Sequence, residues 1–414
     1  MDVPTPKPLE PAAAPERWLN RNVIGMTATS FLSDLGHETA TSILPAFLAM
    51  LGAPPAALGA IEGIADGTSS FVKLGTGWIS DRLGHRKAIT VSGYALTGAS
   101  QAIFALANGW GLILVGRVVG WFGRGIKGPL RSAMMADSVP ASVRGKAIGF
   151  HRAGDTLGAV IGPLLAVVLM PFLNARLGNQ AGASFRAVFL FTAIPGLLAA
   201  AVFALVVQER RRGPNKSLKF WASIRTLPLR LRRALIGVGC FGCGDFSHTL
   251  IILAAIQLLT PSLGTVKASS AAALLYVLHN LTHALAPYPV GALSDRFGRR
   301  PLLSMCYLLG AVVSVALGVM LAQGKGTWGA LAMVFAMAGI TLGIRETLEE
   351  AIVADFAEVE SRGTAYGVLG TVNGIGDLAS SVLVGALWTI HPLWGFGYAA
   401  AAMALGSALI LRVG

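Results

Sequence analysis

The sequence predicts an all-α membrane protein of twelve transmembrane helices, arranged as two related halves. Three observations predict it. The 414 residues are 54% hydrophobic and only 13% charged, with a mean hydropathy of +0.65, whereas soluble domains carry roughly 25% charged residues. Apolar stretches long enough to cross a bilayer recur along the whole chain. Motifs of the first half also return in the second half at a nearly constant offset.

Twelve apolar stretches have the ~20 residues that a helix needs to cross the hydrocarbon core. Because unpaired backbone groups are too costly in lipid, each stretch is expected to be a helix. In the first half we expect spans at residues 22–50, 57–80, 86–107, 110–137, 145–172 and 184–208. In the second half we expect them at residues 233–259, 268–293, 300–322, 326–354, 362–386 and 391–413.

Three repeated motifs show the internal duplication. The segment GWISDRLGHRK from Gly77 returns as GALSDRFGRRP from Gly291, and ADSVPASVRGKAIGF from Ala136 returns as ADFAEVESRGTAYGV from Ala354. Asp34 and His37, in SDLGH, match Asp245 and His248, in GDFSH. The offsets 211 (245 − 34), 214 (291 − 77) and 218 (354 − 136) drift slowly, as insertions between two related halves would cause. Such repeats are strong evidence of architecture.

Basic residues indicate the orientation. Nine Lys and Arg lie between Gln208 and Arg233, whereas the loops expected on the opposite side of the membrane carry four in all. This positive-inside asymmetry places both termini in the cytoplasm, in a multi-pass protein of the cytoplasmic (inner) membrane. The chain divides into an N-terminal segment (1–21), a first bundle (22–208), a basic linker (209–233) and a second bundle (234–414).

The two repeated loops resemble the signature of the major facilitator superfamily, G-x-x-x-D-R-x-G-R-[RK], between its helices 2 and 3. The first copy departs from it at His85, and the second copy fits throughout. The resemblance implies two pseudo-symmetric six-helix bundles around a central substrate site, and a secondary transporter that works by alternating access. We expect the two loops to act as cytoplasmic gates, because Asp81 and Asp295 can each accept from N–H groups at a helix start in the other half, where the helix dipole is positive. The alternative is a basic turn that only sets the topology. The gate residues are Gly77, Asp81, Arg82, Gly84 and Arg86 in the first copy, and Gly291, Asp295, Arg296, Gly298 and Arg299 in the second.

The fifth span carries small residues at four-residue spacing, Gly154, Gly158 and Gly162, followed by Pro163. It is similar to the superfamily's helix-5 antiporter motif, although Ala166 and Val167 stand where that motif has its last two glycines. The resemblance implies export in exchange for protons. The alternative is a close helix–helix contact with a proline kink, because small residues four apart lie on one helix face.

Ionisable residues inside membrane spans are costly, and they indicate function. Asp34 and Glu38 lie one helical turn apart in the first span, and they lead the candidates for a carboxylate on which substrate and proton compete. Asp245 is the matching candidate in the second half. Arg117 is similar to the helix-4 arginine of superfamily exporters. Arg152 and Asp155 are further candidates for coupling, or else a structural ion pair within one helix.

Two substrate classes remain open. One is a small organic molecule, such as an amphipathic cation or a metabolite. The other is a transition-metal ion (Fe, Co, Ni or Zn) held by the two Asp-x-x-His pairs, Asp34 with His37 and Asp245 with His248, since carboxylate and imidazole are suitable ligands. Proton-coupled uptake of a metabolite is a lesser alternative. His279 and His283 also share a helix face, but no carboxylate in that span accompanies them.

Other classes lack their sequence features. The chain contains no G-x-S-x-G, P-loop or H-E-x-x-H motif, so neither an enzyme nor an ATP-driven pump is expected. The net charge of +13 follows the membrane topology rather than a nucleic-acid surface. We therefore expect no cofactor and no nucleic acid. The expected partners are a small-molecule substrate, protons and the lipid bilayer, the driving force is a proton gradient, and the protein works as a monomer.

Overall fold

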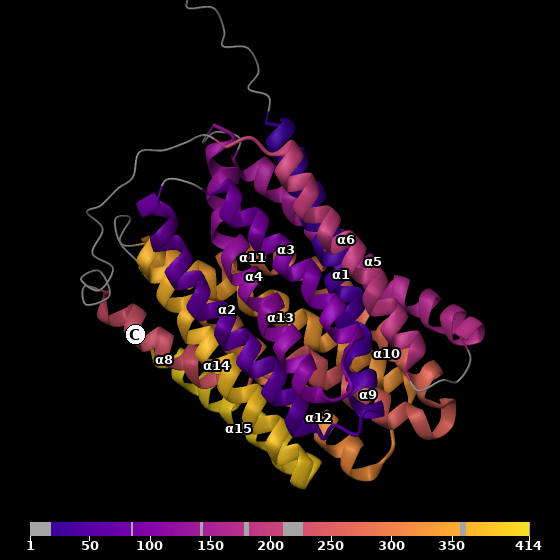
Figure 1. Cartoon of the computed structure of the whole chain (residues 1–414). Coiled ribbons are helices and arrows are strands. Elements are labelled where there is room, and N and C mark those ends of the chain that lie inside the picture. Colours follow the sequence, from indigo (N-terminus) through magenta and orange to yellow (C-terminus); the bar gives the residue numbers. More distant parts are fainter. Residues whose placement is uncertain are drawn as a thin grey trace, which may run out of the picture.

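The computed structural model describes residues 18–83, 86–140, 144–177, 182–209, 227–356 and 362–413, and these residues form helices joined by short connections (Figure 1). The first half contains α1 (Arg21–Met50), α2 (Pro55–Leu83), α3 (Lys87–Ala105), α4 (Trp110–Asp137), α5 (Arg144–Leu177) and α6 (Ala183–Val206). The second half contains α8 (Leu229–Gly242), α9 (His248–Leu263), α10 (Thr265–Leu285), α11 (Pro287–Phe297), α12 (Arg299–Gln323), α13 (Trp328–Phe356), α14 (Arg362–Ile390) and α15 (Pro392–Leu411).

The expected spans agree with these helices within a few residues, with one correction: spans seven and eight are each made of two helices. The seventh breaks between α8 and α9, where Gly242, Gly244 and Ser247 interrupt the helical pattern. The eighth breaks between α10 and α11, where Pro287 has no N–H and cannot continue the backbone bonds. α8 also begins at Leu229, inside the stretch expected as linker.

Residues of α14 satisfy the irregular backbone of the first break. The hydroxyl of Ser380 donates to the carbonyl of Asp245 at 2.8 Å, and the N–H of Ser247 donates to Oγ of Ser381 at 3.1 Å. At Gly244 an added Cβ would lie 2.4 Å from the carbonyl oxygen of Ala399 in α15. Non-helical backbone at membrane depth is tolerated only where protein covers it, and here α14 and α15 provide the cover.

By length and hydropathy alone, six helical segments of the described chain are apolar enough to cross a membrane: Phe150–Leu177, Ala183–Val206, Arg299–Gln323, Trp328–Val353, Ala365–Ile390 and Pro392–Leu411. The long helices α1, α2 and α4 carry more polar and charged side chains, including Asp34, Glu62 and Arg124. The chain is thus a multi-pass membrane protein.

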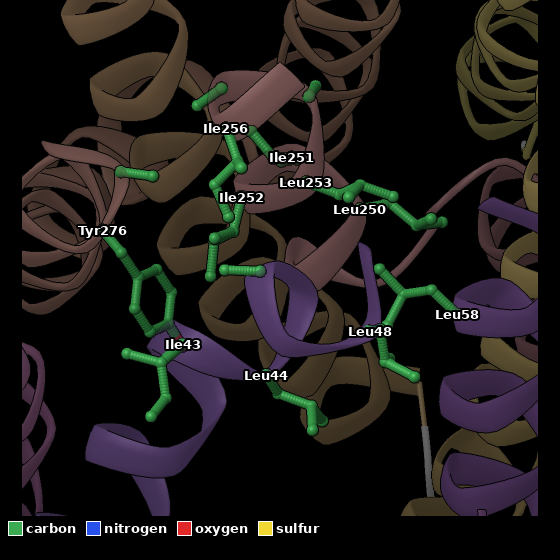
Figure 2. Close-up of a cluster of buried hydrophobic side chains, with 14 of the residues drawn as sticks. Ile43, Leu44, Leu48, Leu58, Leu250, Ile251, Ile252, Leu253, Ile256 and Tyr276 are labelled. Atoms are coloured by element: carbon green, nitrogen blue, oxygen red, sulfur yellow. The ribbon is translucent and has the colours of Figure 1, made fainter. Parts of the chain in front are cut away.

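The two halves share one apolar core at only one end of the described structure, the end at which α1, α9 and α14 finish. This joined end is formed by a cluster that includes Leu44 of α1, Leu58 of α2, Ile252 of α9 and Tyr276 of α10 (Figure 2). Here α2 lies beside α14, and the N–H of Ala56 donates to Oγ1 of Thr389 at 2.9 Å (Figure 1).

At the opposite end each half packs on its own. One cluster there contains only first-half residues, such as Met26 and Phe203, and the other contains only second-half residues, such as Leu303 and Ile352. The bundles are therefore joined at one end and separate at the other, with a polar cavity between them.

Candidate central cavity

A cavity of about 370 Å³ lies between the two bundles and is lined by residues of both halves. Its apolar and aromatic wall includes Trp121, Phe246, Ile251, Tyr276 and Val313. Its ionisable lining is strongly acidic, with two arginines, Arg124 and Arg345, against eight carboxylates: Asp34, Glu38, Glu62, Asp66, Asp155, Asp245, Glu346 and Asp377. Three histidines complete it: His248, His279 and His283.

Three arginines of α4 neutralise carboxylates of the first bundle. They lie seven residues apart on one helix face, and each meets a different helix. Arg117 lies 3.0 Å from Glu62 of α2, Arg124 lies 3.8 Å from Asp34 of α1, and Arg131 lies 3.8 Å from Asp155 of α5. The Arg117–Glu62 pair is fully buried, and removing one partner of a buried pair is strongly destabilising. In the second bundle, Arg345 of α13 pairs in the same way with Asp245.

The other four carboxylates have no Lys or Arg nitrogen within 4.0 Å among the described residues. Glu38 accepts a hydrogen bond from Oη of Tyr276 at 2.8 Å, and Asp66 accepts one from Nε1 of Trp121. Glu346 lies 3.1 Å from Nε2 of His283, and no side chain of the described chain donates to the carboxylate of Asp377. Among the described residues, half of the acidic groups of the cavity thus form no direct ion pair with a Lys or Arg.

Four of the six predicted coupling residues line the cavity, and two do not. Asp34, Glu38, Asp155 and Asp245 line the cavity together. Arg117 does not: it is buried to 1% exposure, stacks on Trp121 at 3.8 Å and donates to Thr41 at 3.1 Å. Arg152 is exposed on α5 and has no carboxylate within 4.0 Å in the described chain. The alternative of an Arg152–Asp155 ion pair is therefore wrong, since Asp155 pairs with Arg131 instead.

The two Asp-x-x-His pairs do not form one site. Asp34 and Asp245 each face an arginine. The imidazole of His37 packs on Trp121 at 4.7 Å, and that of His248 stacks on Tyr276 at 5.1 Å. In the part of the chain that the structure describes, no three His, Cys, Asp or Glu side chains are gathered as a metal site requires.

The glycine face of α5 is packed against α1. An added Cβ on Gly158 would lie 2.6 Å from the carbonyl oxygen of Phe31, and one on Gly162 would lie 2.9 Å from that of Leu35. On Gly154 it would lie 2.4 Å from Cγ2 of Thr27. Pro163 lies inside the same helix. The close helix–helix contact expected of these glycines is present.

The repeated loops lie at the separate end, and the structure describes them in part. Gly84 lies outside the described residues. The structure describes only the helical backbone at Gly77, Asp81, Arg82, Gly291 and Asp295. Arg86 pairs with Asp137 at 3.0 Å, and Arg299 pairs with Asp355 at 3.1 Å. Arg296 lies in the last turn of α11, and Gly298 joins α11 to α12 with φ of +86°, a conformation that favours glycine.

Several residues of the cavity stood out in the sequence only as ionisable groups within spans and were not proposed as site residues: Asp66, His279, His283, Arg345, Glu346 and Asp377. Tyr276 was not singled out. As expected, no carboxylate of α10 itself accompanies its histidines. The carboxylate that meets His283 is Glu346 of α13. For the three residues of α10 the signal was the spacing of three and four between Tyr276, His279 and His283, which puts them on one helix face.

Two helical bundles around a charged central cavity favour a membrane transporter. The sequence model described as Major Facilitator Superfamily matches residues 26–266 and 239–413. The chain therefore belongs to the major facilitator superfamily.

Individual relatives differ in what is known of them. An uncharacterized MFS-type transporter of Methanocaldococcus jannaschii is 28% identical over 398 residues, which cover 96% of each chain. The quinolone resistance protein NorA of Staphylococcus aureus is 23% identical over 201 residues, 49% of each chain. Among solved structures, the nucleoside transporter NupG has a TM-score of 0.73 at 11% identity, covering 95% of this chain and 97% of its own. A POT family transporter in complex with 5-aminolevulinic acid has a TM-score of 0.73 at 13% identity, covering 94% and 95%. These structures bear on the fold alone.

Proposed function

We propose that this transporter is a proton-coupled antiporter that exports a small organic cation by alternating access. One observation carries the proposal: four of the eight cavity carboxylates, Glu38, Asp66, Glu346 and Asp377, have no Lys or Arg nitrogen within 4.0 Å in the described chain. A carboxylate removed from water needs a proton or a nearby cation. Protons and a cationic substrate would therefore compete for the same groups.

Competition of this kind produces exchange. When a cation enters the cavity, the carboxylates that face it lose protons, and when the cation leaves they take protons up again. An empty cavity with ionised carboxylates is costly to close, because closure removes those charges from water. The carrier would then change conformation with either a cation or protons bound, and both would cross the membrane in opposite directions.

The joined end supports an alternating-access cycle. The positive-inside expectation assigns this end to the outside, so that the cavity faces the cytoplasm in the present form. Residues 1–208 and 234–414 would rock about the cavity, separating the cluster around Leu44 and Ile252 while the opposite ends approach. In this proposal the protein is a monomer of the cytoplasmic membrane, with both termini inside and no cofactor besides the proton gradient.

Two observations favour export. The packed face of Gly154, Gly158 and Gly162 in α5 retains part of the antiporter motif. The relative NorA, matched over half of the chain, is a quinolone resistance protein, and export of a drug is one way to produce resistance. The uptake alternative has no specific contact in its favour, and neither has the metal alternative.

A calorimetric titration tests the proposal. The purified protein is titrated with ethidium, spermidine, Co²⁺ and benzoate in two buffers that differ in their heat of protonation. We expect an organic cation to bind with release of protons, so that the heat depends on the buffer, and to bind more tightly as pH rises. Glu38→Gln should release fewer protons. Glu209→Gln is the control, because Glu209 accepts from the N–H of Lys87 outside the cavity. Binding of benzoate alone, or of Co²⁺ alone, would contradict the proposal.

A further inference from the structure

One wall of the cavity carries a line of side chains that exchange protons. Tyr276, His279 and His283 lie on one face of α10, and His248 of α9 lies beside them. Phenol and imidazole groups can each accept one proton and donate another. The order of these residues along α10 leads from the joined end of the cavity toward the separate end.

The residue at each end of this line of side chains is hydrogen-bonded to a carboxylate. At the deep end, Oη of Tyr276 donates to Oε2 of Glu38 at 2.8 Å, and Tyr276 lies among apolar residues such as Ile43 (Figure 2). At the other end, Nε2 of His283 lies 3.1 Å from Oε2 of Glu346, with the two side chains 32% and 50% exposed. One terminal carboxylate is therefore buried and the other is open to the surroundings.

Between these ends the rings follow one another closely. The ring centroids of Tyr276 and His279 are 5.4 Å apart, and those of His279 and His283 are 6.5 Å apart. His248 lies 5.1 Å from Tyr276 and 6.1 Å from His279, and its Nε2 has no hydrogen-bond partner in the described chain. At such separations a single water is able to bridge polar atoms of neighbouring rings.

The orientation of His279 is fixed by its neighbour. The amide nitrogen of Asn280 donates to the carbonyl of Ala159 in α5 at 2.8 Å, so its Oδ1 is the atom that lies 3.2 Å from Nδ1 of His279. Because that oxygen only accepts, Nδ1 of His279 must carry the hydrogen. Its Nε2 is then left with a lone pair that can take a proton from one side and return it on the other.

We propose that Tyr276, His248, His279 and His283 form a proton path along the wall of the cavity, between Glu38 and Glu346. The inference rests on the proposed proton coupling and deepens it. When the cavity faces the cytoplasm, the substrate must enter through the same opening by which the proton leaves. A path along the wall lets the proton leave while a cation approaches Glu38 through the centre.

Each transfer conserves protons. The O–H bond of protonated Glu38 breaks as a bond forms to Oη of Tyr276, and the phenolic proton passes to a histidine nitrogen, directly or through water. His279 gains this proton at Nε2, keeps its Nδ1–H, and gives the proton on to His283 and then to Glu346. The result is one proton moved from Glu38 to Glu346. Each intermediate group ends with the number of protons it had at the start.

Charged groups from the neighbouring helices face this path. Arg345 of α13 is paired with Asp245, and Arg124 of α4 with Asp34. From α5, the charge of Arg152 acts on Glu346 without a direct contact, and Asp155 lines the same cavity. Their charges remain in place when a histidine of the path is replaced, so the variants below change the path alone.

Transport in liposomes separates this path from a packing role. With labelled ethidium as the probe, two rates are compared: accumulation driven by a pH gradient, and exchange of ethidium for ethidium without a gradient. Exchange needs no proton to leave. For His279→Phe, which keeps a ring of similar size, we expect gradient-driven accumulation to fall on the order of tenfold or more while exchange is unchanged. His283→Gln, which cuts the link to Glu346, should act in the same way.

The control variant is His391→Asn, at the N-cap of α15 and outside the cavity, which should behave as wild type. If both rates fall together in His279→Phe and His283→Gln, these residues serve packing and the path is contradicted. If neither rate changes, it is contradicted as well. A wild-type protein that exchanges ethidium but moves no protons would overturn the proposed coupling itself, and the path with it.

Discussion

The hydroxyl of Tyr276 in α10 donates a hydrogen bond to the carboxylate of Glu38 in α1, and so joins the second bundle to the first across the cavity. The bond lies beside the apolar cluster that closes the joined end. It therefore connects a group proposed to bind protons with the contact that must separate in the transport cycle.

Tyr276→Phe should weaken the joined end while leaving the carboxylates of the cavity in place. A hydrogen bond to a charged group contributes about 1.5–3 kcal/mol, and its loss should shift the population toward the form open at that end. Spin labels at Met50 and Leu263, at the ends of α1 and α9, would report longer distances. The matched control is Tyr398→Phe, because Tyr398 packs beside the same apolar cluster and its hydroxyl has no hydrogen-bond partner in the described chain. Equal distances in both variants would show that this bond does not hold the end closed.

Arg117→Met should strongly destabilise the first bundle. The guanidinium is buried and lies 3.0 Å from Glu62, and breaking a buried pair from one side costs about 3–5 kcal/mol. Thermal unfolding in detergent measures this, and adding Glu62→Gln should restore part of the loss. Arg299→Met provides the comparison: its pair with Asp355 is half exposed, so about 1 kcal/mol or less is expected. Similar losses for the two arginines would argue against the buried pair as a stabilising contact.

Gly158→Ala and Gly370→Ala should have opposite effects on stability. A Cβ at Gly158 would press on the backbone of α1, so the helices must move apart. At Gly370 in α14 nothing lies within 4 Å of an added Cβ, and alanine favours a helix over glycine by about 0.5–1 kcal/mol. Thermal unfolding should show a lower midpoint for the first and an equal or higher one for the second. A stabilised Gly158→Ala protein would mean that α1 and α5 are less closely packed than described.

Ser381→Ala should loosen the break between α8 and α9. The substitution removes the acceptor of the Ser247 N–H, and a polar group left unpaired costs about 1–3 kcal/mol. We expect faster hydrogen exchange at residues 243–249, measured by mass spectrometry. Ser407→Ala, in the Ser304–Ser407 contact elsewhere in the bundle, should leave that segment unchanged. Unchanged exchange in Ser381→Ala would show that water or other groups satisfy the break.

The sequence predicted the spans well because a bilayer allows few alternatives. Continuous apolar stretches and the repeated loops were sufficient for the two halves and for helix ends such as Trp110 and Asp137. The break at Asp245 was missed because hydropathy does not distinguish one long helix from two short ones. The groups that stabilise it, Ser380 and Ser381, lie 135 and 134 residues away in sequence.

The cavity was predictable only in part. Buried charges such as Asp34 and Glu38 stand out in an apolar sequence, and both line the cavity. Their partners do not stand out, because neutralisation depends on which helix lies opposite. Arg131 rather than Arg152 meets Asp155, and Glu346 meets His283 from another helix. These pairings arise from packing between helices, which spacing within one helix does not reveal.

The most direct test of the account is accumulation of ethidium in liposomes under an imposed pH gradient, with the interior acidic, recorded together with an internal pH dye. We expect ethidium to accumulate as protons leave, and expect a protonophore, which dissipates the pH gradient, to abolish the accumulation. In Glu38→Gln, accumulation should be lost while ethidium exchange remains. Accumulation that ignores the gradient, or a Glu38→Gln protein that still couples ethidium to protons, would contradict the central claim.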